Sequence, residues 1–261
     1  MGTPENVSLN HVMTPIQRLK AIEATSLGKA LTSLVQAGQI QPAYSMLAPI
    51  LTTRTPFTAL DRIGKTLGSI ALEEVDPLLE HIAAEKTMGG WVVIGSTLGM
   101  QLSRDLAGVV DRCRRFVILS DVWYGTDSLG ERVPGPALVA DFQPSLDLLA
   151  PWREDANRWV RRAVGVAVHF WAKRSRGKKE LKPQGEALLV FLEPMFEERE
   201  IDAIKGVGWG LKTLGKFYPD QVADWLAGQI GNRQRKPRAM MVRKATTYLS
   251  GAQYVRALGL G

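Results

Sequence analysis

Three features of the sequence predict an all-α fold, and more narrowly an α-solenoid. Apolar residues recur at the spacing of one helix face in segments such as LTSLVQAGQIQPAYSMLAPIL, DPLLEHIAAE and GEALLVFLEPMFEE. Strand-like alternation is scarce, and turn-forming residues separate the helical segments at short intervals. A glycine motif also recurs along the chain, which is typical of stacked helical repeats.

The recurring motif is an apolar residue, a glycine, two variable residues and a second apolar residue. Its five copies, with a degenerate sixth at residues 246–249, set their glycines 31, 35, 35 and 43 residues apart, at Gly64, Gly95, Gly130, Gly165 and Gly208. These intervals are close to the period of two-helix HEAT-type repeats. Because glycine costs a helix about 0.5–1 kcal/mol relative to alanine, its recurrence at one phase predicts close packing between helices.

We therefore expect one domain over residues 1–261, an α-solenoid of HEAT-like two-helix repeats with about six helix pairs and a concave basic groove. Residues 1–12 have no apolar run, so a loosely ordered tail is expected there. The chain shows no signal peptide, and its longest apolar run is far shorter than a membrane span. These features predict a cytoplasmic protein without membrane contact, and we expect a monomer.

Cysteine and histidine usage narrows the chemistry. Cys113 is the single cysteine, so the chain has no internal disulfide and a reducing compartment is expected. Its thiol is a candidate nucleophile, but the chain has three histidines and none lies nearby in sequence, which favours a half-buried, unreactive thiol. The sequence has no CxxC pair, HExxH motif or P-loop, and we expect neither a metal nor a cofactor.

Basic residues are concentrated in the second part of the chain. Residues 1–150 carry 12 basic and 15 acidic side chains, whereas residues 151–261 carry 21 basic and 11 acidic ones. Such asymmetry is typical of proteins that bind polyanions, although a solvated basic surface without a partner is the alternative. Two runs, AKRSRGKKELK at 172–182 and NRQRKPR at 232–238, are expected at opposite edges of the solenoid.

Equivalent positions of stacked repeats form a line along a solenoid, and one such line is mostly charged. It takes the residue three before each motif glycine, or before Thr247 in the degenerate sixth copy. In chain order its members are Asp61, Val92, Asp127, Arg162, Lys205 and Lys244. Trp209 follows Lys205 by four residues and therefore shares its helix face. Trp123 precedes Asp127 by four and shares its face if the helix extends back that far. The pattern predicts a surface stripe in which Asp127, Arg162 and Lys205 are neighbours.

Three segments of the chain, VWYGTDS, NRWVRRAVGVAV and IKGVGWGLKTLGKFYPDQV, carry a resemblance to a known family. They resemble signature segments of the AlkD family of DNA alkylation-repair glycosylases, over residues 115–250. The family motif Trp-x-x-x-Asp falls on Trp123 and Asp127, and Trp-x-x-Arg falls on Trp159 and Arg162. The motif Gly-Trp-x-Leu falls on Gly208, Trp209 and Leu211, and it is followed by Pro219 and Asp220.

The resemblance implies an α-solenoid that holds double-stranded DNA in a groove without flipping the damaged base. It also implies excision of positively charged alkylpurines such as 3-methyladenine and 7-methylguanine. The chain departs from the family at Tyr124, where a second tryptophan is usual, and at Lys212, where arginine is frequent. The family's N-terminal aromatic-glycine segment is not recognisable here.

The resemblance and the stripe together nominate the site residues. Asp127 is the candidate catalytic carboxylate, because a carboxylate stabilises the positive charge that develops on deoxyribose as the glycosidic bond breaks. Trp123 and Trp209 would face a cationic base with their electron-rich rings. Arg162 would contact a phosphate with its planar fork. The remaining candidates for DNA contacts are Arg161, Lys205, Lys212, Lys244 and Tyr124.

Each role has a simpler alternative. Asp127 is also compatible with a helix N-cap or a solvated side chain. Tryptophans on helices usually belong to the core, which is how we interpret Trp159. Arg162 is placed to form an ion pair with a carboxylate of a neighbouring helix, including Asp127 itself, and the two roles are compatible if the partner changes when DNA binds. For the whole protein, the alternative to an enzyme is a HEAT-repeat scaffold that binds nucleic acid or an acidic protein.

Overall fold

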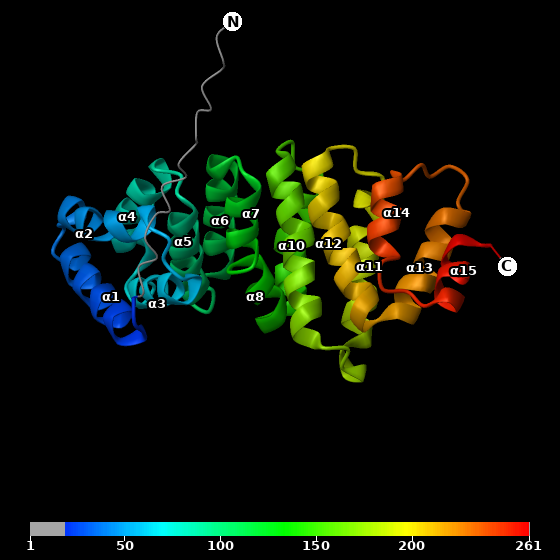
Figure 1. The fold of residues 1–261 in the computed structure, drawn as a ribbon, viewed down its shortest axis with the longest axis horizontal. Helices are drawn as coiled ribbons and strands as arrows, with labels where there is room; N and C mark the ends of the chain where they lie inside the picture. Colours follow the sequence, from blue (N-terminus) through cyan, green and yellow to red (C-terminus); the bar gives the residue numbers. More distant parts are fainter. Residues whose placement is uncertain (1–18, 261) are drawn as a thin grey trace, which may run out of the picture.

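A computed structural model describes residues 19–260 of the chain, and every regular element among them is helical. The helices run from α1 to α15, with the short 3₁₀ helices η1 to η3 between them (Figure 1). Their bounds are α1 Ala21–Gln36, α2 Ile40–Thr52, α3 Phe57–Leu67, α4 Leu72–Ala84, α5 Met88–Gln101, α6 Leu106–Ser120, α7 Trp123–Gly130, α8 Pro134–Ala140, α9 Phe142–Leu149, η1 Ala150–Glu154, α10 Arg158–Ser175, η2 Lys179–Leu181, α11 Lys182–Leu192, η3 Glu193–Glu197, α12 Ile201–Phe217, α13 Pro219–Gly231, α14 Ala239–Ala245 and α15 Gly251–Leu258.

The helices form two rows along an elongated stack, with the N-terminal helices at one end and the C-terminal helices at the other (Figure 1). In the first row α1, α3, α5, α7, α10, α12 and α14 pack side by side in that order. In the second row α2, α4, α6 and α9 follow one another, as do α11, α13 and α15. Each helix of the first row carries one copy of the glycine motif from α3 to α12, so the expected all-α solenoid is confirmed. The tail expected over residues 1–12 lies outside the described residues.

The motif glycines lie where neighbouring helices of the first row approach each other most closely. A Cβ atom on Gly64 of α3 would lie 2.5 Å from the carbonyl oxygen of Val93 on α5. A Cβ on Gly165 of α10 would collide with the backbone of Gly206 on α12. The helix cost of glycine is therefore offset by the close backbone contact that it permits.

Local sequence signals set several of the helix starts. The side chains of Thr87, Asp105 and Asn157 accept backbone N–H groups at the first turns of α5, α6 and α10. The N-cap of α7 is Val122, and the helix begins at Trp123. The N-cap interpretation of Asp127 is therefore wrong, because this residue lies inside the helix one turn after Trp123.

One member of the predicted charged line does not reach the surface. Val92 is fully buried, as are its neighbours along most of α5. The reason is that α5 is enclosed by α2, α3, α4, α6 and α7. The charged line is interrupted at this helix, and its C-terminal part begins again at α7.

Candidate active site and nucleic-acid interface

An ion pair between Asp127 of α7 and Arg162 of α10 lies at the centre of the candidate site. The guanidinium Nε and Nη2 donate to the two carboxylate oxygens at 2.8 Å each. A further bond of 3.1 Å runs from Nη1 to the backbone carbonyl of Asp202 on α12. The Arg162 side chain is 8% exposed and that of Asp127 is 17% exposed. This geometry fixes the carboxylate plane, and the Asp127 side chain remains partly accessible to solvent.

The two candidate tryptophans lie on different helices of the first row, Trp123 on α7 and Trp209 on α12. Trp123 shares the α7 face of Asp127 and its side chain is exposed, with the ring edge against Tyr124 at a centroid distance of 5.7 Å. Trp209 lies on α12 and is partly exposed. The Trp123 ring is exposed, so the core interpretation is wrong for it. Trp209 is only partly exposed, and its ring packs on His169.

Several cations gather beside the ion pair, where α12 meets α14. Burial lowers the pKa of Lys244, and the nearby charges of Lys212, Arg162, Arg243 and Lys205 lower it further. Within residues 19–260 neither Lys205 nor Lys244 has a carboxylate within ion-pair distance. Lys205 and Lys244 are therefore positive charges held close together without a carboxylate partner, which is favourable for binding a polyanion. The sequence predicted Asp127, Arg162 and Lys205 as neighbours. The structure joins Asp127 to Arg162 and brings the charges of Arg162 and Lys205 near Lys244, and the part of these residues in DNA binding stays a prediction.

Other predicted contact residues have different surroundings. Arg161 pairs with Glu198 at 2.6 Å and donates to the carbonyl of Asp155, so the structure turns it away from the stripe. Tyr124 is half-buried, and its hydroxyl lies 3.5 Å from the carbonyl of Lys86. Lys212 lies over the ring of Tyr248 at 5.3 Å.

Trp159 and the two basic runs also have clear positions. Trp159 is buried and its indole N–H donates to Asp121 at 2.6 Å, which confirms the packing role. The run 172–182 leaves the lower end of α10 and the run 232–238 leaves the upper end of α13, on opposite edges of the stack (Figure 1). Arg235 in the second run pairs with Glu193 at 2.7 Å, which reduces the net charge of that loop.

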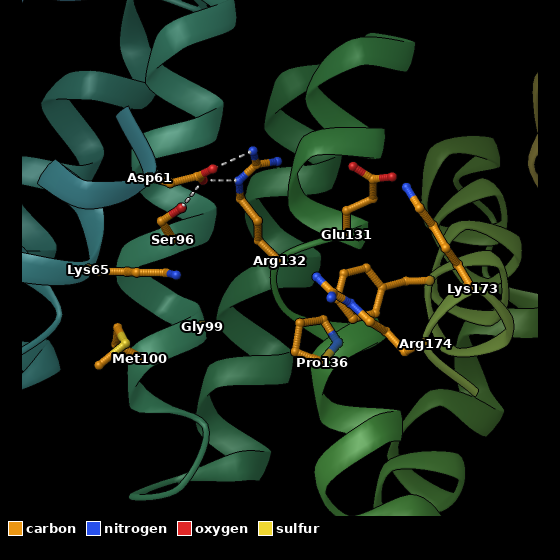
Figure 2. A pocket seen from close by; sticks show the side chains of 11 residues that line it. Asp61, Lys65, Ser96, Gly99, Met100, Glu131, Arg132, Pro136, Lys173 and Arg174 are labelled. Carbon is orange, nitrogen blue, oxygen red and sulfur yellow. Dashed lines mark hydrogen bonds and ion pairs between the residues drawn. The ribbon is translucent and has the colours of Figure 1, made fainter. Parts of the chain in front are cut away.

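The same row of helices also contains a polar cavity of about 410 Å³ (Figure 2). One wall is a network in which Asp61 accepts bonds of 2.6 Å from Ser96 and from Arg132. Glu131 and Lys173 lie on the opposite side of the cavity (Figure 2). Because Glu131 follows Asp127 by four residues at the end of α7, the cavity and the Asp127 carboxylate share one helix face.

Comparison with known proteins identifies the family. The family model described as DNA alkylation repair enzyme matches residues 64–249, which is well over half of the chain and includes Trp123, Asp127, Arg162 and Trp209. The chain belongs to this family. No curated protein sequence matches the chain.

A solved structure similar to this DNA alkylation repair family member is the Pseudomonas fluorescens alkylpurine DNA glycosylase AlkC bound to DNA containing an abasic site analog. The TM-score is 0.55 and the sequence identity 17%, with 92% of this chain and 65% of that chain covered. The chain therefore spans less than two thirds of the length of AlkC. At this identity the likeness concerns the α-helical solenoid fold.

Sequence reasoning missed one residue of this family member's site. His169 of α10 stacks on Trp209 with ring centroids 3.8 Å apart and an angle of 24° between the planes. Burial, followed by the charge of Lys173, lowers its pKa to about 4. The available signal was spacing, because His169 follows Arg162 by seven residues and so lies two turns along the same face.

The cysteine thiol and the possible metal ligands offer no further candidate site among residues 19–260. Cys113 is fully buried rather than half-buried as expected, and burial raises the pKa of its thiol, which disfavours the reactive thiolate. Among residues 19–260 no group of three or more His, Cys, Asp or Glu side chains is placed to hold a metal ion. No helix in the same part of the chain combines the length and apolar character needed to cross a bilayer.

Proposed function

We propose that this protein is a DNA glycosylase that excises positively charged alkylated purines, of the 3-methyladenine and 7-methylguanine type, from double-stranded DNA. The observation that carries the proposal is the Asp127 carboxylate, which Arg162 holds at both oxygens and which lies one helix turn from the exposed Trp123. Membership of the DNA alkylation repair enzyme family supports it.

The chemistry needs little acid assistance, because an N3- or N7-alkylated purine already carries a positive charge. When the bond from the base to C1′ breaks, the base takes both bonding electrons and leaves as a neutral molecule. Positive charge then develops on the deoxyribose, and water adds to C1′ with release of one proton. A fixed carboxylate near the sugar stabilises that charge in the transition state more than in the ground state. Asp127 is the proposed carboxylate.

The surrounding side chains have complementary roles in this proposal. Trp123 and Trp209 offer π faces to the cationic base or the sugar, and a desolvated cation–π contact contributes about 2 kcal/mol. Arg162 orients Asp127, and it would contact a phosphate only if its partner changes when DNA binds. Lys205, Lys212 and Lys244 supply sequence-independent attraction to the DNA backbone. Arg161 is the weakest of the proposed contacts, because Glu198 already occupies its guanidinium.

The proposal is tested by incubating the purified protein with methylated duplex DNA and measuring free 3-methyladenine and 7-methylguanine. Asp127→Asn keeps the size of the side chain and a hydrogen-bond acceptor but removes the charge. We expect it to lower base release by about 100-fold or more, as for loss of a group that stabilises transition-state charge. Asp111→Asn is the matched control, because Asp111 is an exposed carboxylate on α6 in the second row.

The scaffold alternative makes a different prediction in the same experiment. A protein that only binds DNA would release neither base nor any bulkier cationic adduct, and its salt-sensitive binding would survive Asp127→Asn unchanged. Salt dependence alone does not separate the two functions, because both rely on contacts with phosphates. Base release by the unaltered protein therefore decides between them.

A further inference from the structure

The hydrogen-bond contacts around His169 favour one position for the proton of its neutral ring. The Thr213 hydroxyl donates its single hydrogen to the backbone carbonyl of Trp209 at 2.9 Å. The same oxygen lies 2.7 Å from Nδ1 of His169 and therefore accepts a proton from it. The neutral ring carries its hydrogen on Nδ1, and its Nε2 presents a lone pair.

That lone pair points toward a second acceptor. Nε2 of His169 is buried without a hydrogen-bond partner and lies 3.7 Å from a carboxylate oxygen of Glu131. A lone pair and an ionised carboxylate repel each other at this distance, so beside an uncharged ring the protonated form of the Glu131 carboxyl is favoured. Burial raises the pKa of Glu131, and the charges of Arg132 and Lys173 oppose the rise.

The charged groups around the imidazole come from two helices. The end of α7 contributes Glu131, and α10 itself contributes Lys173 one turn beyond His169. The segment α8, which packs on α10, consists of Pro, Gly, Ala, Leu and Val and has no titratable side chain. From α12 the ring meets Thr213 and Trp209, which are both uncharged.

We propose that His169 is a positioning residue that backs Trp209 with an uncharged ring, so that the indole keeps its electron-rich face available for a cationic base. The inference rests on the proposed function, because it assigns the substrate class to this tryptophan. A protonated imidazole 3.8 Å from the indole centroid would itself be the cation that the π system attracts. Thr213 links the two rings, since its hydroxyl bonds the imidazole of one residue and the backbone of the other.

The protonation state is read directly by ¹⁵N NMR of protein labelled at its three histidines, His11, His81 and His169. The His169 signals are assigned by their loss in His169→Phe. We expect a neutral ring protonated on Nδ1 at pH 7. A charged ring, or a proton on Nε2, would overturn the proposal without reference to any enzymatic activity.

The functional arm compares binding to two duplexes, one with a cationic 3-methyladenine and one with its uncharged 3-deaza isostere. His169→Phe keeps an uncharged stacked ring, and we expect both affinities within about threefold of the unaltered protein. His169→Arg places a permanent cation behind Trp209, and we expect a loss of roughly tenfold on the cationic duplex alone. Thermal unfolding of each variant identifies loss of folding.

An equal loss on both duplexes with His169→Arg would show a merely structural role and refute the inference, even if the unaltered protein releases base. Conversely, charge discrimination in binding without any base release would refute the glycosylase proposal and leave the role of His169 intact. If the unaltered protein binds the two duplexes with equal affinity, Trp209 does not distinguish a cationic base from an uncharged one, and the inference fails.

Discussion

Replacing Arg162 with glutamine should destabilise the protein far more than replacing an exposed arginine on the same helix. The guanidinium makes two bonds of 2.8 Å to Asp127 and one of 3.1 Å to the Asp202 carbonyl, with 8% of the side chain exposed. Removal of one partner of a buried pair costs about 3–5 kcal/mol. Because Asp127 is 17% exposed and can regain water, we expect about 3 kcal/mol.

The measurement is urea unfolding followed by circular dichroism, for Arg162→Gln, Asp127→Asn and the double variant. Coupled partners should make the double variant about 1.5–3 kcal/mol more stable than the sum of the single losses predicts. Arg158→Gln is the control, because this side chain is 44% exposed and its contact with Asp202 is 3.4 Å, so a loss below about 0.5 kcal/mol is expected. Single losses that are small and strictly additive would show that the ion pair does not hold α7 against α10.

Three further predictions concern packing, DNA contact and pH. Gly165→Ala should lower the free energy of unfolding, measured with urea, by at least ~2 kcal/mol, because the new Cβ meets the backbone of α12. Gly228→Ala is the control: its Cβ would have nothing within 4 Å, so the same measurement should show a rise of about 0.5–1 kcal/mol. If Lys205 contacts one phosphate, Lys205→Ala should reduce the slope of log K against log salt for duplex binding by about 0.9. Lys29→Ala, at an exposed position on α1, should leave this slope unchanged. The pKa of His169 is lowered from 6.5 to about 4, so its contribution to stability is complete above pH 6.5 and is lost as pH falls through 4. Between pH 6.5 and 4, the stability of His169→Phe in thermal unfolding should therefore fall less than that of the unaltered protein, by on the order of 2 kcal/mol after allowance for solvent screening. An equal fall in the two proteins would contradict the assignment.

The helical periodicity and the glycine register were sufficient to predict the solenoid and part of the site. The register places Asp127 of α7 and Arg162 of α10 at the same repeat position, and the structure joins them in an ion pair. It also placed Lys205 and Lys244 near Arg162, where the shared positive charge lowers the Lys244 pKa. A residue's position within the repeat predicts its neighbours in the fold, because each helix pair of a solenoid packs on the next in the same way.

The glycine register was less informative about burial and ion pairing where the surroundings of one helix differ from those of the other helices in its row. Val92 occupies the charged line in sequence but is buried, because α5 is enclosed on all sides. Arg161 adjoins Arg162 in the chain, yet successive helix residues point about 100° apart, and Glu198 captures its guanidinium. Neither outcome is encoded in local spacing, because each depends on which other segment lies opposite.

The sequence by itself determined an all-α solenoid, its glycine-mediated helix contacts and the family to which the chain belongs. Only the tertiary structure decided that Asp127 lies inside a helix, that both of its oxygens are bonded to Arg162, and that His169 stacks on Trp209. Helix formation follows from short-range periodicity, which a single segment contains. The protonation state and the contacts of a side chain depend on its burial and on charges from other helices. Both are fixed only when the repeats stack.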